Sequence, residues 1–167
     1  MIHDVATTLT DYVDISRRIA DLGCRDPKAI ALLPINFDSA SSISELRQAS
    51  EAATIKKLLL KAGVPIEDIV DRSQRPPYVK NKHSDWVAPI LFVSASLCSQ
   101  NPALVSLALD VIGNYATEFF RGMASTPEVS FSIVVGRRNG TYKKVEYRGP
   151  VVGLKGMAEV IREVGNE

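Results

Sequence analysis

The sequence predicts an α+β fold in which about five helices pack against a small, mainly antiparallel sheet. A C-terminal β-hairpin is indicated by alternating apolar residues over 129–135, a turn sequence at Asn139-Gly140 and a return strand over 141–148. A third strand is indicated by the unbroken apolar run from Ala29 to Leu33. The other long segments repeat apolar residues at helical spacing, and residues 1–167 are expected to form a single domain.

The N-terminal segment Asp4–Leu22 is expected to be a helix, because its apolar residues recur about every 3.6 positions. Threonines within 7–10 favour a strand over its first half instead. The buried strand follows at Ala29. Since Pro34 cannot donate a hydrogen bond to a sheet, this strand either ends near Leu33 or holds Pro34 at an edge or bulge.

A longer helix is expected from about Ser42 to Ala62. Ser42 and Glu45 match the capping-box pattern, in which each side chain satisfies a free amide of the other residue. Pro65 is expected to open one more short helix over 64–70. Three lysines suit the negative end of the dipole of the longer helix: Lys56, Lys57 and Lys61.

The segment 71–85 is a basic connection, broken by prolines, with no helical or strand-like pattern. A connection of this length without structure of its own is uncommon in a compact domain and is often functional. The sequence therefore favours this loop as a place where an anionic ligand or nucleic acid binds. Its candidate residues are Arg72, Arg75, Lys80 and Lys82.

Two apolar helices are expected next, from Trp86 to Leu97 and from Pro102 to Arg121, the second opened by its proline. Apolar residues lie nearly all round the second helix. Such a helix is normally central in a core or shared with another chain, so the sequence predicts self-association through this pair. The candidate interface residues are Trp86, Leu109, Ile112, Tyr115, Phe119 and Phe120.

The register of the hairpin depends on the length of its turn. A two-residue turn at Asn139-Gly140 would set charged residues opposite the apolar residues of the first strand. A three-residue loop with Gly140 left-handed in a bulge instead pairs Phe131 with Tyr147, and the sequence predicts this arrangement. The outer face and tip of the hairpin are then a second candidate surface for nucleic acid or another anion: Arg138, Tyr142, Lys144 and Arg148.

The C-terminal segment is expected to be a helix that opens at Gly149-Pro150. Gly153 and Gly156 each weaken such a helix by about 1 kcal/mol relative to alanine, so it needs tertiary packing. Its apolar face is expected to hold Leu154, Met157, Ala158 and Ile161.

Charge is distributed unevenly along a chain whose formal net charge is only +1. Residues 1–71 carry a net charge of −3, residues 72–148 of +5, and residues 149–167 of −1. The overall balance excludes a strongly basic polyanion-binding protein, whereas the central stretch favours local binding of an anion.

The motif content excludes several classes of protein. Two cysteines, Cys24 and Cys98, are too few for a disulfide-rich scaffold or a four-thiolate zinc site. The sequence contains no phosphate-binding loop, dinucleotide motif or metal-ligand spacing, so neither cofactor nor metal is expected. Without a secretory leader or an apolar run of about 20 residues, the protein is expected in the cytoplasm.

The leading functional hypothesis is a non-enzymatic interaction or regulatory accessory module that self-associates through its apolar helices. The alternative is nucleic-acid or anionic-ligand binding through the basic hairpin and the 72–83 loop. A third hypothesis is an enzyme whose site forms only in an oligomer. The absence of any nucleophile and base at catalytic spacing favours the first two.

Overall fold

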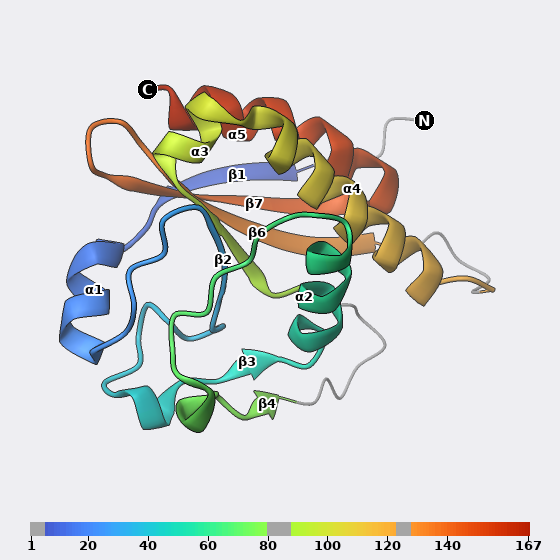
Figure 1. Ribbon diagram of the computed structural model, residues 1–167. Coiled ribbons are helices and arrows are strands. Elements are labelled where there is room, and N and C mark those ends of the chain that lie inside the picture. The colour runs from blue at the N-terminus through green and yellow to red at the C-terminus, as the bar shows by residue number, and fades with distance from the viewer. Residues whose placement is uncertain (1–5, 80–87, 123–127) are drawn as a thin grey trace.

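The computed structural model describes residues 6–79, 88–122 and 128–167, and its fold is α+β (Figure 1). One five-stranded sheet has the order β1-β7-β6-β5-β2. β5 and β6 run parallel and the other neighbours antiparallel. The α+β class is confirmed, but the sheet is mixed and larger than predicted. Its strands are β1 (Ala6–Asp11), β2 (Ile30–Leu33), β5 (Ile90–Val93), β6 (Glu128–Gly136) and β7 (Tyr142–Pro150).

Helices cover both faces of this sheet (Figure 1). α3, α4 and α5 lie together over one face, and α1 lies on the opposite side. α2 packs against α4. The five α-helices of the described residues are α1 (Ile15–Leu22), α2 (Ala52–Lys61), α3 (Ala95–Gln100), α4 (Pro102–Phe119) and α5 (Met157–Gly165).

The core consists of two apolar clusters, one on each face of the sheet. Leu91 and Val93 belong to the cluster beneath α4 and α5, whereas Ile90 and Phe92 belong to the cluster beside α1. Successive side chains of a strand point to opposite faces. β5 is therefore buried at all four of its positions, because it contributes to both clusters.

The N-terminal helix is shorter than predicted. Residues 6–11 form β1 along the edge of β7, so the helix prediction for this half of Asp4–Leu22 was wrong and the threonines reflect the strand. α1 begins at Ile15 because the Asp14 side chain accepts a hydrogen bond from the Arg17 amide at 3.3 Å. It ends at Gly23, whose φ of +75° suits glycine.

The long helix predicted from Ser42 begins only at Ala52. Residues 43–45 form a single 3-10 turn (η1), and Gln48–Ala49 (β3) pair in parallel with Tyr78–Val79 (β4). The Glu45 carboxylate reaches back to the Ser41 amide at 2.9 Å, but the Ser42 hydroxyl makes no capping bond. Pairing with distant chain therefore outweighs the local helix signal before residue 52.

The helix predicted from Trp86 to Leu97 is also not formed over most of its described length. Its centre is the strand β5, and a helix, α3, begins only at Ala95. The segment 64–70 is likewise no helix: the Glu67 amide donates to the Ile30 carbonyl at 2.9 Å and covers the outer edge of β2. Both helix predictions were wrong because these residues form backbone hydrogen bonds with strands that are distant in the sequence.

Three local predictions are confirmed. β2 ends at Leu33, directly before Pro34. α4 begins at Pro102. Phe131 lies opposite Tyr147 in the hairpin, and the three-residue loop holds Gly140 at a φ of +83°. The same register sets Ile133 opposite Val145 and Val135 opposite Lys143.

The C-terminal helix starts later than predicted. β7 extends to Pro150, a 3-10 helix (η3, Val151–Gly156) follows, and α5 begins at Met157. The buried Tyr147 hydroxyl donates to the Pro150 carbonyl at 2.6 Å and occupies the space that a Cβ on Gly153 would need. Gly153 is therefore required by the Tyr147 ring and is not merely tolerated.

We predict that Gly153→Ala lowers the free energy of unfolding by about 1–3 kcal/mol, the usual cost of overpacking a core. The new methyl group would overlap the hydroxyl of Tyr147, which is 1% exposed and held in place. Urea denaturation measures the change. Gly156→Ala is the control, since a Cβ there meets nothing within 4 Å. Equal effects of the two substitutions would contradict this account.

Candidate functional site

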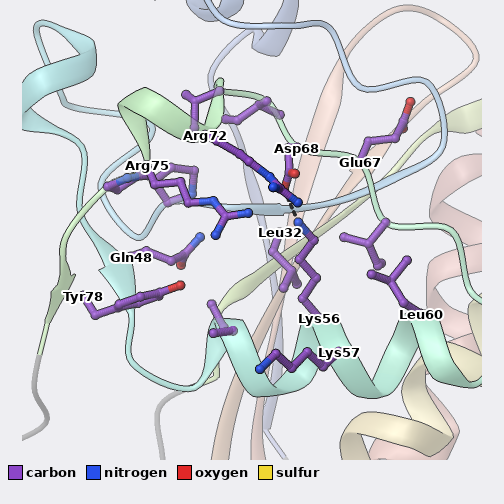
Figure 2. A pocket seen from close by; sticks show the side chains of 17 residues that line it. Leu32, Gln48, Lys56, Lys57, Leu60, Glu67, Asp68, Arg72, Arg75 and Tyr78 are labelled. Atoms are coloured by element: carbon purple, nitrogen blue, oxygen red, sulfur yellow. Dashed lines mark hydrogen bonds and ion pairs between the residues drawn. The ribbon is translucent and has the colours of Figure 1, made fainter.

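A cavity of about 360 Å³ opens between α2 and the segment 66–78 (Figure 2). Its floor is the end of β2, with Leu32 and Pro34, and β3 and β4 close one end. This volume is near the lower limit of small-molecule pockets, which hold roughly 300–1,000 Å³. The cavity is therefore large enough for a compact organic ligand.

One face of α2 forms a wall of the cavity. Ile55 and Leu59 are fully buried in the core, and they fix which way the helix is turned. The residues that line the cavity from α2 follow the spacing of a single helical face: Ala52, Ala53, Lys56, Lys57 and Leu60. Burial of the neighbouring face thus places two lysines beside the cavity.

The facing wall carries two arginines on a 3-10 helix, η2 (Arg72–Gln74), and its following residue. The Arg25 guanidinium pairs with the Asp71 carboxylate just before η2, and the Arg25 amide donates to the Ile69 carbonyl at 2.7 Å. This attachment holds η2 to the body of the protein. Figure 2 shows the guanidinium groups of Arg72 and Arg75 directed into the cavity.

The cavity lining carries an excess of positive charge. Four cations and two carboxylates line it, for a net charge of +2. Asp68 pairs with Lys56 at 2.6 Å. The Glu67 carboxylate accepts the amides of Lys28 and Ala29 at 2.8 and 2.7 Å, so it too is engaged. Among the described residues, no ion pair involves the remaining three cations, which are Lys57, Arg72 and Arg75.

Neutral hydrogen-bond donors stand at the same end as the arginines. Gln48 is only 8% exposed, and its side-chain oxygen accepts the Ala49 amide at 2.8 Å. Its amide nitrogen is therefore left to face the cavity, as Figure 2 shows, and the Tyr78 hydroxyl points the same way. The opposite end is apolar, with Leu60 and Ile66.

This arrangement presents hydrogen-bond donors and positive charge to the cavity. Guanidinium, ammonium, amide and phenol groups all donate hydrogen bonds, and charge-assisted bonds to an anion are the strongest of these. Among the described residues that line the cavity, none is a serine, threonine, cysteine or histidine. The ionisable side chains of these lining residues are the lysines, arginines, carboxylates and Tyr78.

Only two of the predicted anion-binding residues that the structure describes line this cavity. Arg72 and Arg75 line the cavity, whereas Lys80 and Lys82 lie outside the described residues. The hairpin does not join this site, since β6 and β5 separate β7 from β2 in the sheet. The sequence did not predict that Gln48 and Tyr78 line a cavity. It related Lys56 and Lys57 only to the dipole of their helix, and their place in the cavity lining was not predicted.

The hairpin candidates are not gathered into a basic surface. The Tyr142 hydroxyl lies 3.1 Å from the Ser16 hydroxyl, and its ring centroid is 6.3 Å from that of Phe92. Lys144 and Arg148 lie on the same face of β7 as Glu146, which stands between them. Arg138 is exposed at the tip. Tyr142 is thus packed against its own chain, and the charges on the face of β7 alternate in sign.

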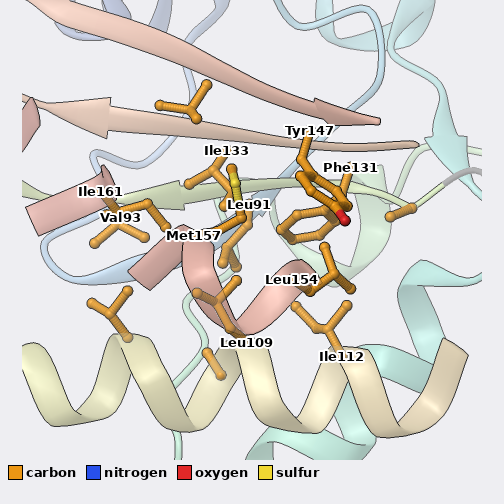
Figure 3. Close-up of a cluster of buried hydrophobic side chains, with 14 of the residues drawn as sticks. Leu91, Val93, Leu109, Ile112, Phe131, Ile133, Tyr147, Leu154, Met157 and Ile161 are labelled. Carbon is orange, nitrogen blue, oxygen red and sulfur yellow. The ribbon is translucent and has the colours of Figure 1, made fainter. Parts of the chain in front are cut away.

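The candidate interface residues of α4 are mostly turned inward. Figure 3 shows Leu109 and Ile112 pointing toward the sheet, and both are fully buried, as is most of Phe120. The Tyr115 hydroxyl donates to the Glu51 carboxylate and so links α4 to α2. Burial and this hydrogen bond raise the pKa of Tyr115 to about 12. Phe119 remains 44% exposed, and Trp86 lies outside the described residues.

Other chemistries receive little support from the described residues. Burial raises the pKa of the Cys98 thiol to about 11 and also raises that of Cys24, so neither forms a thiolate readily. Nowhere in the described part of the chain do three or more histidine, cysteine or acidic side chains gather as metal ligands would. No helix of the described residues combines the length and apolar character needed to cross a membrane.

The fold and the cavity together define an α+β protein with a cation-lined pocket at one edge of its sheet. Comparison of the chain with protein-family models, with curated proteins and with solved structures found no match. Its function is therefore inferred from its own residues.

We predict that Leu109→Asp and Phe119→Asp have very different effects. Leu109 is 1% exposed, so Leu109→Asp places a carboxylate in the core. We expect the free energy of unfolding to fall by about 4 kcal/mol or more, which abolishes the cooperative thermal transition. Phe119→Asp should lower the free energy of unfolding by about 1 kcal/mol. The Phe119 ring is 44% exposed, and its ring contacts are with Tyr115 and Phe120.

Circular dichroism and sedimentation velocity measure the two outcomes. If the wild type is oligomeric and folded Phe119→Asp is monomeric, the exposed end of α4 is the interface. A folded Leu109→Asp variant would contradict the assignment of Leu109 to the core.

Proposed function

We propose that this protein binds a small organic anion in the cavity between α2 and the segment 66–78. The observation that carries the proposal is that Lys57, Arg72 and Arg75 line one cavity and make no ion pair among the described residues. An anion bound in the cavity would offset the excess positive charge of its lining. Of the two hypotheses drawn from the sequence, this proposal develops the anionic-ligand alternative.

The size and shape of the cavity favour a small molecule over a nucleic acid. A volume of about 360 Å³ accommodates a compact ligand but not a duplex. The hairpin offers no continuous row of cations, because Glu146 separates Lys144 from Arg148 on one face. Self-association remains a separate proposal that depends on the exposed Phe119 end of α4.

We predict that pyrophosphate binds to the wild type and that Arg72→Gln and Arg75→Gln each weaken it about tenfold. A charge-assisted hydrogen bond contributes about 1.5–3 kcal/mol, and the lower value suits these exposed arginines. Isothermal titration calorimetry at low ionic strength measures the affinity. Binding should weaken as salt is added, since mobile ions screen the charges.

Arg138→Gln is the matched control, because it removes another exposed arginine, at the hairpin tip. It should leave pyrophosphate affinity unchanged. An equal loss in Arg138→Gln, or no binding of pyrophosphate to the wild type at millimolar concentration, would overturn the proposed function.

A further inference from the structure

We propose that the ligand of this cavity is a phosphomonoester with an apolar carbon body. The inference rests on the proposed function and specifies the chemical class of the anion. Three properties of the cavity support it, namely its net charge, the alignment of its two arginines and its division into a polar and an apolar end.

The net charge of the lining matches a dianion. With Asp68 paired to Lys56 and Glu67 bonded to two backbone amides, the cavity keeps a net charge of +2. A phosphomonoester carries a charge of about −1.5 to −2 at pH 7. A carboxylate or a phosphodiester carries only about −1 and would leave repulsion among the cations.

The two arginines are spaced to hold one tetrahedral group. Arg72 opens η2 and Arg75 follows its last residue, three positions further on. Side chains at i and i+3 of a 3-10 helix lie one above the other, and Figure 2 shows both guanidinium groups in the cavity. Each guanidinium offers two parallel N–H groups to one anion. A phosphomonoester has three terminal oxygens to receive the two forks, whereas a carboxylate has only two oxygens in one plane.

The apolar end of the cavity predicts a carbon body on the phosphate. Leu60 is 50% exposed at this end, beside Ile66 and the floor residue Leu32. Inorganic phosphate would occupy only the end near Gln48 and leave these side chains in water. Burying apolar surface stabilises a complex by about 25 cal/mol per Å², so a ligand that covers Leu60 binds more tightly.

Calorimetry with four matched probes tests the inference: phenyl phosphate, methyl phenyl phosphate, benzoate and inorganic phosphate. Phenyl phosphate should bind at least about tenfold more tightly than the diester or benzoate, because only it combines the dianion with the ring. It should also exceed inorganic phosphate by about threefold or more through burial of the ring. Unchanged melting temperatures verify that the variants below are folded.

Two variants separate charge, geometry and apolar contact. Arg72→Lys keeps the charge but loses the fork, and it should weaken phenyl phosphate about tenfold while weakening benzoate less. Leu60→Asn should weaken phenyl phosphate but leave inorganic phosphate unchanged. Lys61→Gln, next along α2 but outside the cavity lining, is the control and should change neither.

The outcomes distinguish this inference from the proposed function. If benzoate and methyl phenyl phosphate bind as tightly as phenyl phosphate, and Arg72→Gln weakens all three, the cavity is an anion site and the phosphomonoester inference is wrong. If Arg72→Lys binds phenyl phosphate as the wild type does, the argument from the two forks is wrong. If pyrophosphate binds but none of these probes does, the phosphomonoester inference alone is wrong. If neither pyrophosphate nor any probe binds, both the inference and the proposed function are overturned.

Discussion

The burial of β5 on both of its faces is the constraint on which the rest of the structure depends. Its four residues supply both apolar clusters, so helices are needed on each side of the sheet. Because β5 runs parallel to β6, the chain must cross over the sheet between them, and α3 and α4 form that crossover. The apolar surface of α4 is thereby directed onto the sheet, against Phe131 and Ile133.

The candidate site is a secondary consequence of the same arrangement. β2 pairs with β5 on one side only, and residues 66–67 cover its outer edge through the Glu67 amide. The Glu67 carboxylate then ties this segment to the turn before β2. With one wall attached to β2 and the other formed by the exposed face of α2, a cavity is left between them, and both walls contribute cations.

Features determined by neighbouring residues were predicted correctly from the sequence. The hairpin register follows from a three-residue loop that favours glycine at position 140, together with cross-strand partners a few residues away. Pro102 likewise marks the start of α4. Arg72 and Arg75 could be predicted as anion-binding candidates because their loop is basic and irregular. The lysines that line the same cavity, Lys56 and Lys57, lie about 15 residues earlier on α2 and share no local sequence pattern with the arginines.

The sequence by itself therefore determined the α+β class, the hairpin and its register, the position of α4 and half of the cations of the site. Only the tertiary structure decided that Ala6–Asp11 and Ile90–Val93 are strands, because a short apolar or threonine-rich run suits either a helix or a strand until a partner strand is present. It also decided which face of α2 is buried, since Ile55 and Leu59 follow the core. Lys56 and Lys57 line the cavity with the arginines for that reason, and no local signal in the sequence specifies it.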